Sequence, residues 1–577
     1  MTSPRRRIAI LGLGPKGLFA LERLVHHAAC EGAALEVDAY ETHDEPGAGP
    51  VYDTSQPEYL RMNLAADRLD LWSGDNSAVP AAERLSFQEW RRASGAAGRE
   101  ADDRYPPRAV VGRYLVDGLE RVRRRLPVGM RLRLVTQEAR AARTDHAQWT
   151  IIAADGSVRA YDEVLLAVGH GTGAPMSHAR AWPHAAPLVP AVFPVTRWLT
   201  VESIHPGTVV AVRGFALTFI DAALALTEGR GGTFEVELHP HRLRYVPSSN
   251  DVRLILPFSR TGRPMLAKAD PQLARSIPAL DEVAGLGSSR LAALPSGFDL
   301  RGDLLPILAS TAAASLLVGN GHRTEGERSR RIAGAAAAWL GRACDGSAPV
   351  AALDPVEEVQ RSLDVGAGLR PPDLLWALAN GWQSLYPALV GRVSGTGLAP
   401  ASWPAFLRLA AEMERIAFGP PPVNARKLLA LVAAGRIDLS HVRAGRITTE
   451  DGMTSLGRGP SRRRLDVVVD AVLAAPGARA SRSPLVRGVV ADGLARVASR
   501  RRGLEVTADG GCIGRDGRRT AGLSAIGRAT EDSVVGNDTL NRRLHPQADR
   551  WARRVARAAS TRADAPRDAG ERRGEAA

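Results

Sequence analysis

Hydrophobic and polar positions near the N-terminus follow the order expected for a strand, a turn, a helix and a second strand. The apolar run at residues 8–11 predicts a buried parallel strand, and residues 18–26 predict the helix after it. Residues 35–40 predict the second strand. A strand, a crossover helix and a parallel strand form the βαβ unit of doubly wound α/β domains, so the pattern predicts this class of fold.

A second strand-and-helix pattern occurs farther along the chain. Residues 209–214 predict a strand that ends in a glycine turn, residues 218–228 predict the helix, and residues 252–259 predict the strand after it. Residues 300–440 are mostly helical in pattern and rich in Ala and Leu. Three later segments return the chain to the α/β body, namely strands at 465–469 and 523–526 and a helix at 546–558.

Charge and composition exclude some partners. The net charge is +14, yet the only lysines are Lys16, Lys268 and Lys427, and the arginines are scattered without interleaved aromatic residues. A nucleic-acid platform needs a basic stripe or stacking aromatics, so we expect no nucleic-acid partner. An acidic substrate, or the phosphates of NADPH, remains compatible with the charge.

Cysteine usage and hydropathy point to a cytoplasmic protein. Cys30, Cys344 and Cys512 form no CxxC pair and no metal-ligand spacing, which indicates a reducing compartment and no redox-active dithiol. We expect no bound metal. The apolar run after Arg5–Arg7 is too short for a signal peptide, and no stretch is expected to reach the roughly 18–20 apolar residues of a membrane span.

The first glycine turn carries the clearest chemistry. Gly12, Gly14 and Gly17 form a GxGxxG pattern between a predicted strand and a predicted helix. A pyrophosphate must approach the backbone N–H groups at a helix N-terminus, where a Cβ would block it. Glu41 ends the second strand, where a carboxylate accepts hydrogen bonds from ribose hydroxyls. The sequence therefore predicts a dinucleotide site here.

One further segment fits a role in dinucleotide binding. Residues 162–167 predict a strand that ends in small residues, and Gly169 and His170 follow it at the edge of the predicted site. His170 is expected to orient a loop or contact the cofactor rather than to act as a base.

The second glycine turn keeps Gly214 but has Ala216 and Phe219 where the other two glycines of the fingerprint would fall. It predicts a nicotinamide-nucleotide site in a degenerate form. Arg260, at the end of the following strand, could bind the 2′-phosphate of NADPH, since a guanidinium matches phosphate bidentately. A solvated surface arginine is the alternative.

These motifs, taken in order, resemble the FAD-NAD(P)-binding proteins related to flavin-dependent N-hydroxylating monooxygenases, among them the nitrosuccinate-forming L-aspartate N-monooxygenases. The matching stretches span nearly the whole chain: ILGLGPKGLFALERL (10–24), GAGPVYD (47–53), LRMNL (60–64), YPPRAVVGRYL (105–115), EVLLAVGHG (163–171), FALTFIDAALALTEGRGG (215–232), SRTGRP (259–264) and LSAIG (523–527). The resemblance implies FAD in the first domain and NADPH at the second glycine turn. It also implies that Gly49, Asn63, Arg108 and Tyr114 line the flavin or the cleft, and that Gly527 ends the last flavin-binding strand.

The expected fold class is α/β, a Rossmann-like flavoprotein with two dinucleotide-binding domains and a helical insertion. The expected parts are a first FAD-binding part (1–200), an NAD(P)H-binding region (201–300), a helical insertion (301–440), a return to the dinucleotide-binding body (441–558) and a disordered tail (559–577). The helical insertion could cover the site, recognise the substrate or form a homo-oligomer face, and composition does not choose among these.

The resemblance implies an NADPH-dependent monooxygenase that acts with O₂ on a small-molecule amine or amino acid. N-oxygenation of L-aspartate to nitrosuccinate is the most specific expectation, and the missing CxxC pair agrees with it. No catalytic residue is identifiable from the sequence. Two alternatives stay open: a flavin dehydrogenase or reductase with another acceptor, and a non-catalytic FAD-binding protein, which the degenerate second glycine turn favours.

Overall fold

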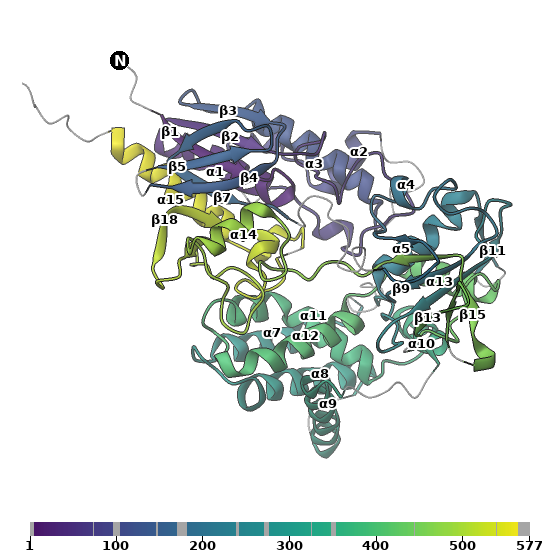
Figure 1. The fold of residues 1–577 in the computed structure, drawn as a ribbon. Helices are drawn as coiled ribbons and strands as arrows, with labels where there is room; N and C mark the ends of the chain where they lie inside the picture. The colour runs from purple at the N-terminus through teal and green to yellow at the C-terminus, as the bar shows by residue number, and fades with distance from the viewer. Residues whose placement is uncertain are drawn as a thin grey trace, which may run out of the picture.

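The structure is a computed structural model. It describes residues 5–563 apart from 73, 75, 96–103, 146–147, 170–181, 238–241, 270–275, 323, 325, 348–353, 444, 458 and 538. The described residues form two parallel sheets, each covered by helices, and a separate group of helices below them in Figure 1. The predicted α/β class with a helical insertion is therefore confirmed.

The first sheet brings together the two ends of the chain. Its order is β17-β18-β7-β1-β2-β3, and every pair except β17–β18 is parallel. The strands are β1 (Arg6–Leu11), β2 (Leu35–Tyr40), β3 (Met130–Val135), β7 (Glu163–Leu166), β17 (Gly511–Ile513) and β18 (Arg519–Ala525). Ile8 pairs with Val37 on β2 and with Glu163 on β7, so β1 lies in the middle of the sheet and is fully buried there. A continuous apolar run is what this position requires.

Different layers cover the two faces of the first sheet (Figure 1). Helices α1 (Pro15–Glu31), α3 (Arg108–Arg123) and α15 (Gln547–Ala563) share one apolar core with it. The other face packs against a small antiparallel sheet and a short helix. These are β4 (Ala139–Thr144), β5 (Trp149–Ala153), β6 (Val158–Tyr161) and α14 (Pro484–Ala491). Helix α2 (Phe87–Ala93) adds Phe87 and Trp90 to the α1 side.

The second sheet is built around the second glycine turn. Its order is β12-β9-β16-β8, with all pairs parallel. The strands are β8 (Leu188–Val189), β9 (Val209–Arg213), β12 (Leu254–Phe258) and β16 (Val467–Asp470). One face packs against α5 (Leu217–Ala225), α13 (Pro422–Ala433) and the hairpin of β10 (Thr233–Val236) and β11 (Leu243–Val246). The other face contacts the small sheet of β13 (Ile447–Glu450), β14 (Met453–Leu456) and β15 (Arg463–Arg464).

The helical unit has its own apolar core. Its helices are α7 (Ala279–Ala292), α8 (Leu305–Gly319), α9 (Glu327–Asp345), α11 (Leu374–Val393) and α12 (Trp403–Ala417). Helix α10 (Pro355–Gly366) packs mainly on α13, and the short α4 (Val195–Trp198) lies beside the second sheet. Among the described residues one helical stretch, Leu300–Gly319, is long and apolar enough to cross a membrane, with a mean hydropathy of 1.5. The expectation that no segment reaches this length is thus corrected. Its 18-residue window is 56% buried, because α8 packs between α7, α9 and α11.

Several element boundaries differ from the sequence expectations. Helix α1 begins at Pro15, three residues before the predicted start, because proline is well suited to the first helical turn. Helix α15 continues to Ala563, five residues past the predicted end and into the segment expected to be a disordered tail. Trp551 and Val555 are fully buried against α1, and this packing stabilises a helix of low mean hydropathy. The proposed domain boundaries remain predictions.

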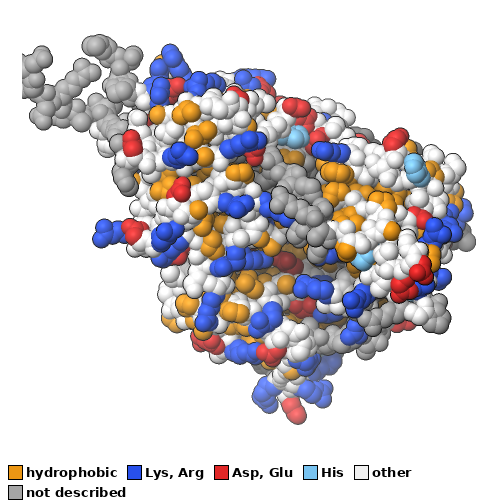
Figure 2. Space-filling view, viewed as in Figure 1, with side chains coloured by type: hydrophobic (Ala, Val, Ile, Leu, Met, Phe, Trp, Pro, Cys, Tyr) orange, Lys and Arg blue, Asp and Glu red, His pale blue; other side chains and the backbone are white. Residues whose placement is uncertain are grey.

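Basic side chains are spread over the surface seen in Figure 2. On that face, Lys and Arg side chains alternate with acidic, apolar and uncharged ones over all three units. Many arginines have a carboxylate partner within 4 Å, such as Arg301 with Asp345 and Arg496 with Glu505. The net positive charge is therefore distributed on this face and not gathered into one stripe.

Candidate dinucleotide site

The first glycine turn has the geometry that its sequence predicts. Gly12 has φ +100°, and a Cβ there would lie 2.5 Å from the carbonyl oxygen of Ala167. A Cβ at Gly17 would lie 2.1 Å from the carbonyl oxygen of Gly12. At Gly14, however, a Cβ would meet no atom within 4 Å. Gly12 and Gly17 are required for packing, whereas Gly14 leaves open space at the N-terminus of α1, where an anion can bind.

Glu41 lies at the edge of this turn. Its carboxylate accepts hydrogen bonds from the backbone N–H groups of Leu13 at 2.9 Å, Thr42 at 2.8 Å and His43 at 3.1 Å. These bonds fix the side chain beside the first residue after Gly12. A carboxylate has lone pairs for more acceptor bonds than these, so it can also receive ribose hydroxyls at the predicted position.

A loop covers the glycine turn. The N–H of Gly47 donates to the carbonyl of Leu13 at 2.6 Å. Gly49 has φ +64°, and a Cβ there would lie 3.3 Å from the Cα of Gly14. The structure therefore brings Gly49 to the predicted site. Gly169, with φ +56°, follows the end of β7 and is exposed, whereas His170 lies outside the described residues.

A cavity of about 260 Å³ extends along α1 from the carboxyl end of the first sheet, where β18 ends. Gly527 has φ +74°, and a Cβ there would lie 3.2 Å from Cγ of Lys16, so the last strand meets the start of α1 at the cavity. The lining residues are Lys16, Phe19, Arg23, Ile526, Gly527, Thr530, Asn537, Arg542, His545, Pro546, Gln547, Ala548 and Asp549. Within the described part of the chain, His545 Nδ1 and Gln547 Oε1 are buried without a hydrogen-bond partner. Both residues border the cavity, so a polar ligand could satisfy these atoms.

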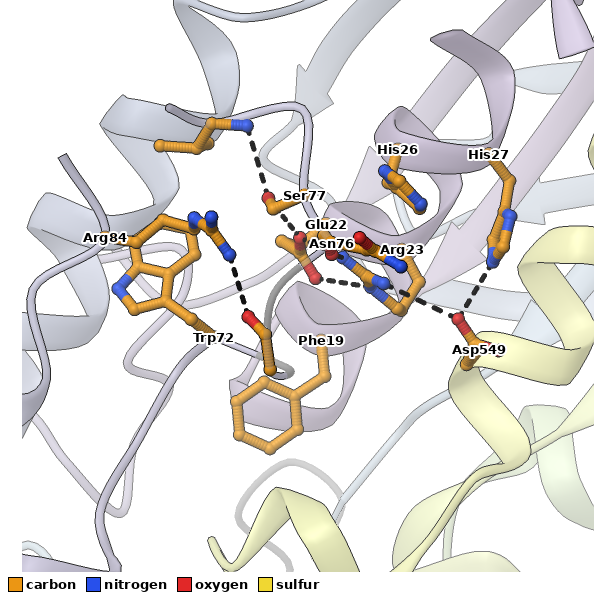
Figure 3. A network of polar contacts seen from close by, with 12 residues as sticks. Phe19, Glu22, Arg23, His26, His27, Trp72, Asn76, Ser77, Arg84 and Asp549 are labelled. Atoms are coloured by element: carbon orange, nitrogen blue, oxygen red, sulfur yellow. Dashed lines mark hydrogen bonds and ion pairs between the residues drawn. The ribbon is translucent and has the colours of Figure 1, made fainter. Parts of the chain in front are cut away.

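The wall of the cavity is an ion-pair network (Figure 3). Glu22 accepts hydrogen bonds from Arg23 at 2.7 Å, from Ser77 at 2.6 Å, and from Arg542. Burial by itself would raise the pKa of Glu22, but the two arginines outweigh it and lower the pKa to about 2. Asp549 binds His27 at 2.8 Å and lies 3.6 Å from Arg23, and these partners lower its pKa to about 2 as well. Both carboxylates are neutralised by cations within the protein, so we assign them a structural role.

The second glycine turn keeps its shape but not its fingerprint. Gly214 has φ +116° and lies beside Ala471. Ala216 precedes the first residue of α5, and Phe219 is 1% exposed and fills the apolar core where the third glycine would fall. The side chain of Arg213 binds Asp470 at 3.0 Å. The N-terminus of α5 still follows the turn. Because Phe219 occupies the position of the third glycine, α5 contacts the sheet through this side chain and not through close backbone approach.

Arg260 is exposed two residues after β12 ends. The N–H of Ser259 donates to the carbonyl of Val442 at 2.8 Å, which places Arg443, also exposed, beside this segment. The sequence analysis missed Arg443, because 183 residues separate it from Arg260 and no local pattern marks it. The two arginines at one edge of the second sheet form a candidate phosphate site.

The remaining predicted residues have different environments. Arg108 donates to Asp221 on α5 at 2.7 Å and to the carbonyl of Arg61 at 3.2 Å, so it joins the first unit to the second. Burial raises the pKa of Asp221, and Arg108 opposes that shift. Tyr114 is 3% exposed, donates to the carbonyl of Leu85 and accepts from the N–H of Leu71. It lies in the core and not on a cleft.

Asn63 lies where the first unit meets the helical unit. Its side-chain amide donates to the carbonyl of Phe418, which follows α12, at 3.4 Å. Its own carbonyl accepts a hydrogen bond from Lys268. The sequence analysis did not single out Lys268 as a site residue. The available signal was its residue type, since lysine occurs only three times in this arginine-rich chain.

The two parallel sheets, each with a glycine turn before a helix, define a protein of the dinucleotide-binding α/β class. Residues 9–171 match the family model described as FAD-NAD(P)-binding.

Curated relatives match about half of the chain. A nitrosuccinic acid synthase of Aspergillus oryzae is 34% identical over 282 residues, which is 46% of this chain and 41% of that protein. A nitrosuccinate-forming L-aspartate N-monooxygenase of Streptomyces cremeus is 31% identical over 302 residues, 47% of this chain and 44% of that protein. The chain thus spans about half the length of these relatives or less.

Among solved structures, a lysine monooxygenase from Nocardia farcinica aligns over 95% of this chain and 98% of its own, with 13% identity and a TM-score of 0.44.

Proposed function

We propose that the protein is an FAD- and NADPH-dependent monooxygenase that N-oxygenates the amine of a small amino acid, with L-aspartate as the leading substrate and nitrosuccinate as the product. The observation that carries the proposal is the first glycine turn, where Gly14 leaves open space at a helix N-terminus and Glu41 lies beside it. The similarity of about half the chain to nitrosuccinate-forming enzymes supports the choice of substrate.

The residues present fit an FAD. Backbone N–H groups after Gly12 and at the start of α1 would hold the pyrophosphate, and Glu41 would accept the ribose hydroxyls. Asn537, His545 and Gln547 border the cavity beside Gly527 and would supply polar contacts to the part of the cofactor that extends there. When bound, the flavin supplies the redox chemistry, accepting hydride from NADPH and activating O₂.

The protein's own contribution is to bind, orient and exclude water. Arg260 and Arg443 would hold the 2′-phosphate of NADPH at the edge of the second sheet. The ion pair between Arg108 and Asp221 would keep the two dinucleotide-binding units in a fixed relation. The helical unit, through Phe418, would close the side of the site at Asn63 and limit access of water.

The test uses FAD-loaded full-length protein. We expect NADPH to bleach the flavin under anaerobic conditions, and L-aspartate to couple NADPH oxidation to oxygen uptake with nitrosuccinate detected by mass spectrometry. Glycine, D-aspartate and L-lysine are the comparison substrates. Bleaching without oxygenated product from any amine would instead support a reductase with another acceptor. A bound flavin that NADPH does not reduce would support the non-catalytic alternative, which the Ala216 and Phe219 departures favour.

A further inference from the structure

Lys268 is held in place by a segment that runs along the end of α12. The N–H of Leu266 donates to the carbonyl of Arg415 at 3.0 Å, and the N–H of Lys268 donates to the carbonyl of Pro420 at 3.0 Å. The approach is so close that a Cβ at Gly419 would lie 1.9 Å from the carbonyl oxygen of Leu266. The backbone of Lys268 is therefore fixed against the helical unit, and its side chain points toward Asn63 of the first unit.

The contacts of the Lys268 ammonium within the described structure are to neutral groups. Nζ donates to the backbone carbonyl of Asn63 and lies 5.7 Å from the ring centroid of Phe418. The charge that acts on it from the described residues is Arg68, which is also positive. Burial and Arg68 together lower the pKa of Lys268 from its usual 10.5 to about 7. An ammonium held away from water without an anion is costly, and among the described residues no carboxylate pairs with Lys268.

Lys427 shows how the same chain satisfies a largely buried lysine. Its ammonium also lies over an aromatic ring, 5.1 Å from the centroid of Phe234. Unlike Lys268, it binds both carboxylate oxygens of Glu228, at 2.6 and 2.7 Å. Lys268 has the ring and a carbonyl but no such carboxylate among the described residues. Among the described residues, the ammonium of Lys268 therefore has a place for a carboxylate that a ligand could supply.

We infer that Lys268 binds a carboxylate of the substrate, and so selects amino acids with a free acid group at this position. The inference rests on the proposed function and extends it to a specificity-determining residue. It also rests on location, because Lys268 lies between Asn63 of the first unit and Phe418 of the helical unit, the side that the helical unit is proposed to close. A carboxylate at Nζ would restore the ion pair and favour the protonated amine.

Binding of a carboxylate should therefore be coupled to proton uptake. At pH 8 a group with a pKa of about 7 is roughly one-tenth protonated, and pairing with a carboxylate would drive it close to full protonation. Succinate is the probe, because it carries two ionised carboxylates at this pH and no amine that could release a proton. Calorimetry at pH 8 in two buffers with different ionisation enthalpies measures the protons taken up.

Wild-type FAD-loaded protein with NADP⁺ should bind succinate and take up roughly one proton per site. Lys268→Met should weaken binding by about tenfold or more and abolish the uptake. Lys268→Arg should retain part of the affinity but take up no proton, because arginine stays protonated at this pH. Lys427→Met, which removes a lysine already paired with Glu228, is the matched control and should bind succinate like the wild type.

Two results would overturn the inference: wild-type protein that binds neither succinate nor L-aspartate, or a Lys268→Met variant with unchanged affinity and unchanged proton uptake. Lys268→Arg decides the matter if Lys268→Met does not fold. Anaerobic bleaching by NADPH is recorded on the same samples. If NADPH bleaches the flavin normally but the Lys268 variants bind succinate like the wild type, the proposed function stands and this inference is wrong. If NADPH never bleaches the flavin but succinate binding depends on Lys268, the proposed redox function is wrong and the carboxylate site stands.

Discussion

At the scale of single residues, the three glycines of the first turn should respond differently to alanine. A Cβ at Gly14 meets nothing within 4 Å, and its φ of −72° is allowed for alanine. Gly14→Ala should therefore fold with nearly unchanged thermal stability but lose FAD affinity by about tenfold or more, because only the pyrophosphate would meet the new methyl group. Thermal unfolding of apoprotein and FAD titration by fluorescence measure the two effects separately.

Gly12→Ala and Gly334→Ala are the controls for Gly14→Ala. Alanine at Gly12 would meet the carbonyl of Ala167 at 2.5 Å with φ +100°, so it should lose stability by about 1–3 kcal/mol as well as FAD affinity. Alanine at Gly334 meets no atom within 4 Å on α9, so it should leave FAD affinity unchanged and raise stability by about 1 kcal/mol through its higher helix propensity. A Gly14→Ala protein that binds FAD normally would contradict the assignment of this turn.

Glu22 gives a residue-scale prediction about acid stability. The pKa of Glu22 is about 2 in the folded protein and near 4.5 when unfolded, so its stabilisation is complete above pH 4.5 and disappears as the pH falls toward 2. Glu22→Gln should cost about 3 kcal/mol at pH 7, since Arg23 and Arg542 would lose their carboxylate in a buried site. The difference between wild type and variant should shrink in denaturant titrations at pH 3. A constant difference from pH 7 to pH 3 would contradict it.

At the scale of elements, the carboxyl end of β12 should decide between NADPH and NADH. Arg260 and Arg443 lie at that end on adjacent segments, while Arg253 lies at the opposite end of the strand. Arg260→Met and Arg443→Met should each raise the Kd for NADPH by about tenfold and leave NADH binding unchanged, because only NADPH has the 2′-phosphate. Titrations with both nucleotides measure this, and Arg253→Met is the matched control. Equal losses for NADPH and NADH would contradict a phosphate site here.

Which elements could be predicted depended on how local their signals are. The strand at residues 8–11 and the turn at Gly12 are defined within a dozen residues, so the sequence predicted both. A strand at 465–469 was also predicted and corresponds to β16, but its place beside β9 and β8, more than 250 residues away, was not, because only tertiary packing sets that position. The strands β4 and β6 are short and partly exposed, and their polar residues gave no apolar run to detect.

The residues of the candidate site likewise fall into two groups, those marked by a local motif and those positioned by distant partners. Gly12, Gly14, Gly17 and Glu41 lie in one continuous motif, and the structure brings them together. Tyr114 carries no local mark that separates a core tyrosine from one at a cleft, and its hydroxyl is used by Leu71 and Leu85. Lys268 and Arg443 are placed at the candidate sites by residues far away in the sequence, Asn63 and Ser259 respectively. Their neighbours depend on how the units pack, which the pattern along the chain does not encode.

At the scale of the whole molecule, the helical unit should act on substrate binding through the segment that carries Lys268. Glu412 on α12 binds Arg263 at 2.6 and 2.8 Å, and it also accepts from Arg415, which donates to the carbonyl of Pro264 at 2.8 Å. These largely buried contacts join the segment to the helical unit. A change at Glu412 should therefore move Lys268 without touching either glycine turn.

Glu412→Gln should raise the KM for L-aspartate several-fold while leaving kcat and the anaerobic rate of flavin reduction by NADPH nearly unchanged. The reason is that glutamine keeps the shape but removes the charge that neutralises Arg263 and Arg415, so the segment loosens and Lys268 loses its position. Steady-state oxygen uptake and stopped-flow reduction separate the two effects. Glu450→Gln, which breaks an exposed pair with Arg462, should change neither. If Glu412→Gln slows flavin reduction as much as it raises KM, the helical unit supports the dinucleotide sites and not the carboxylate.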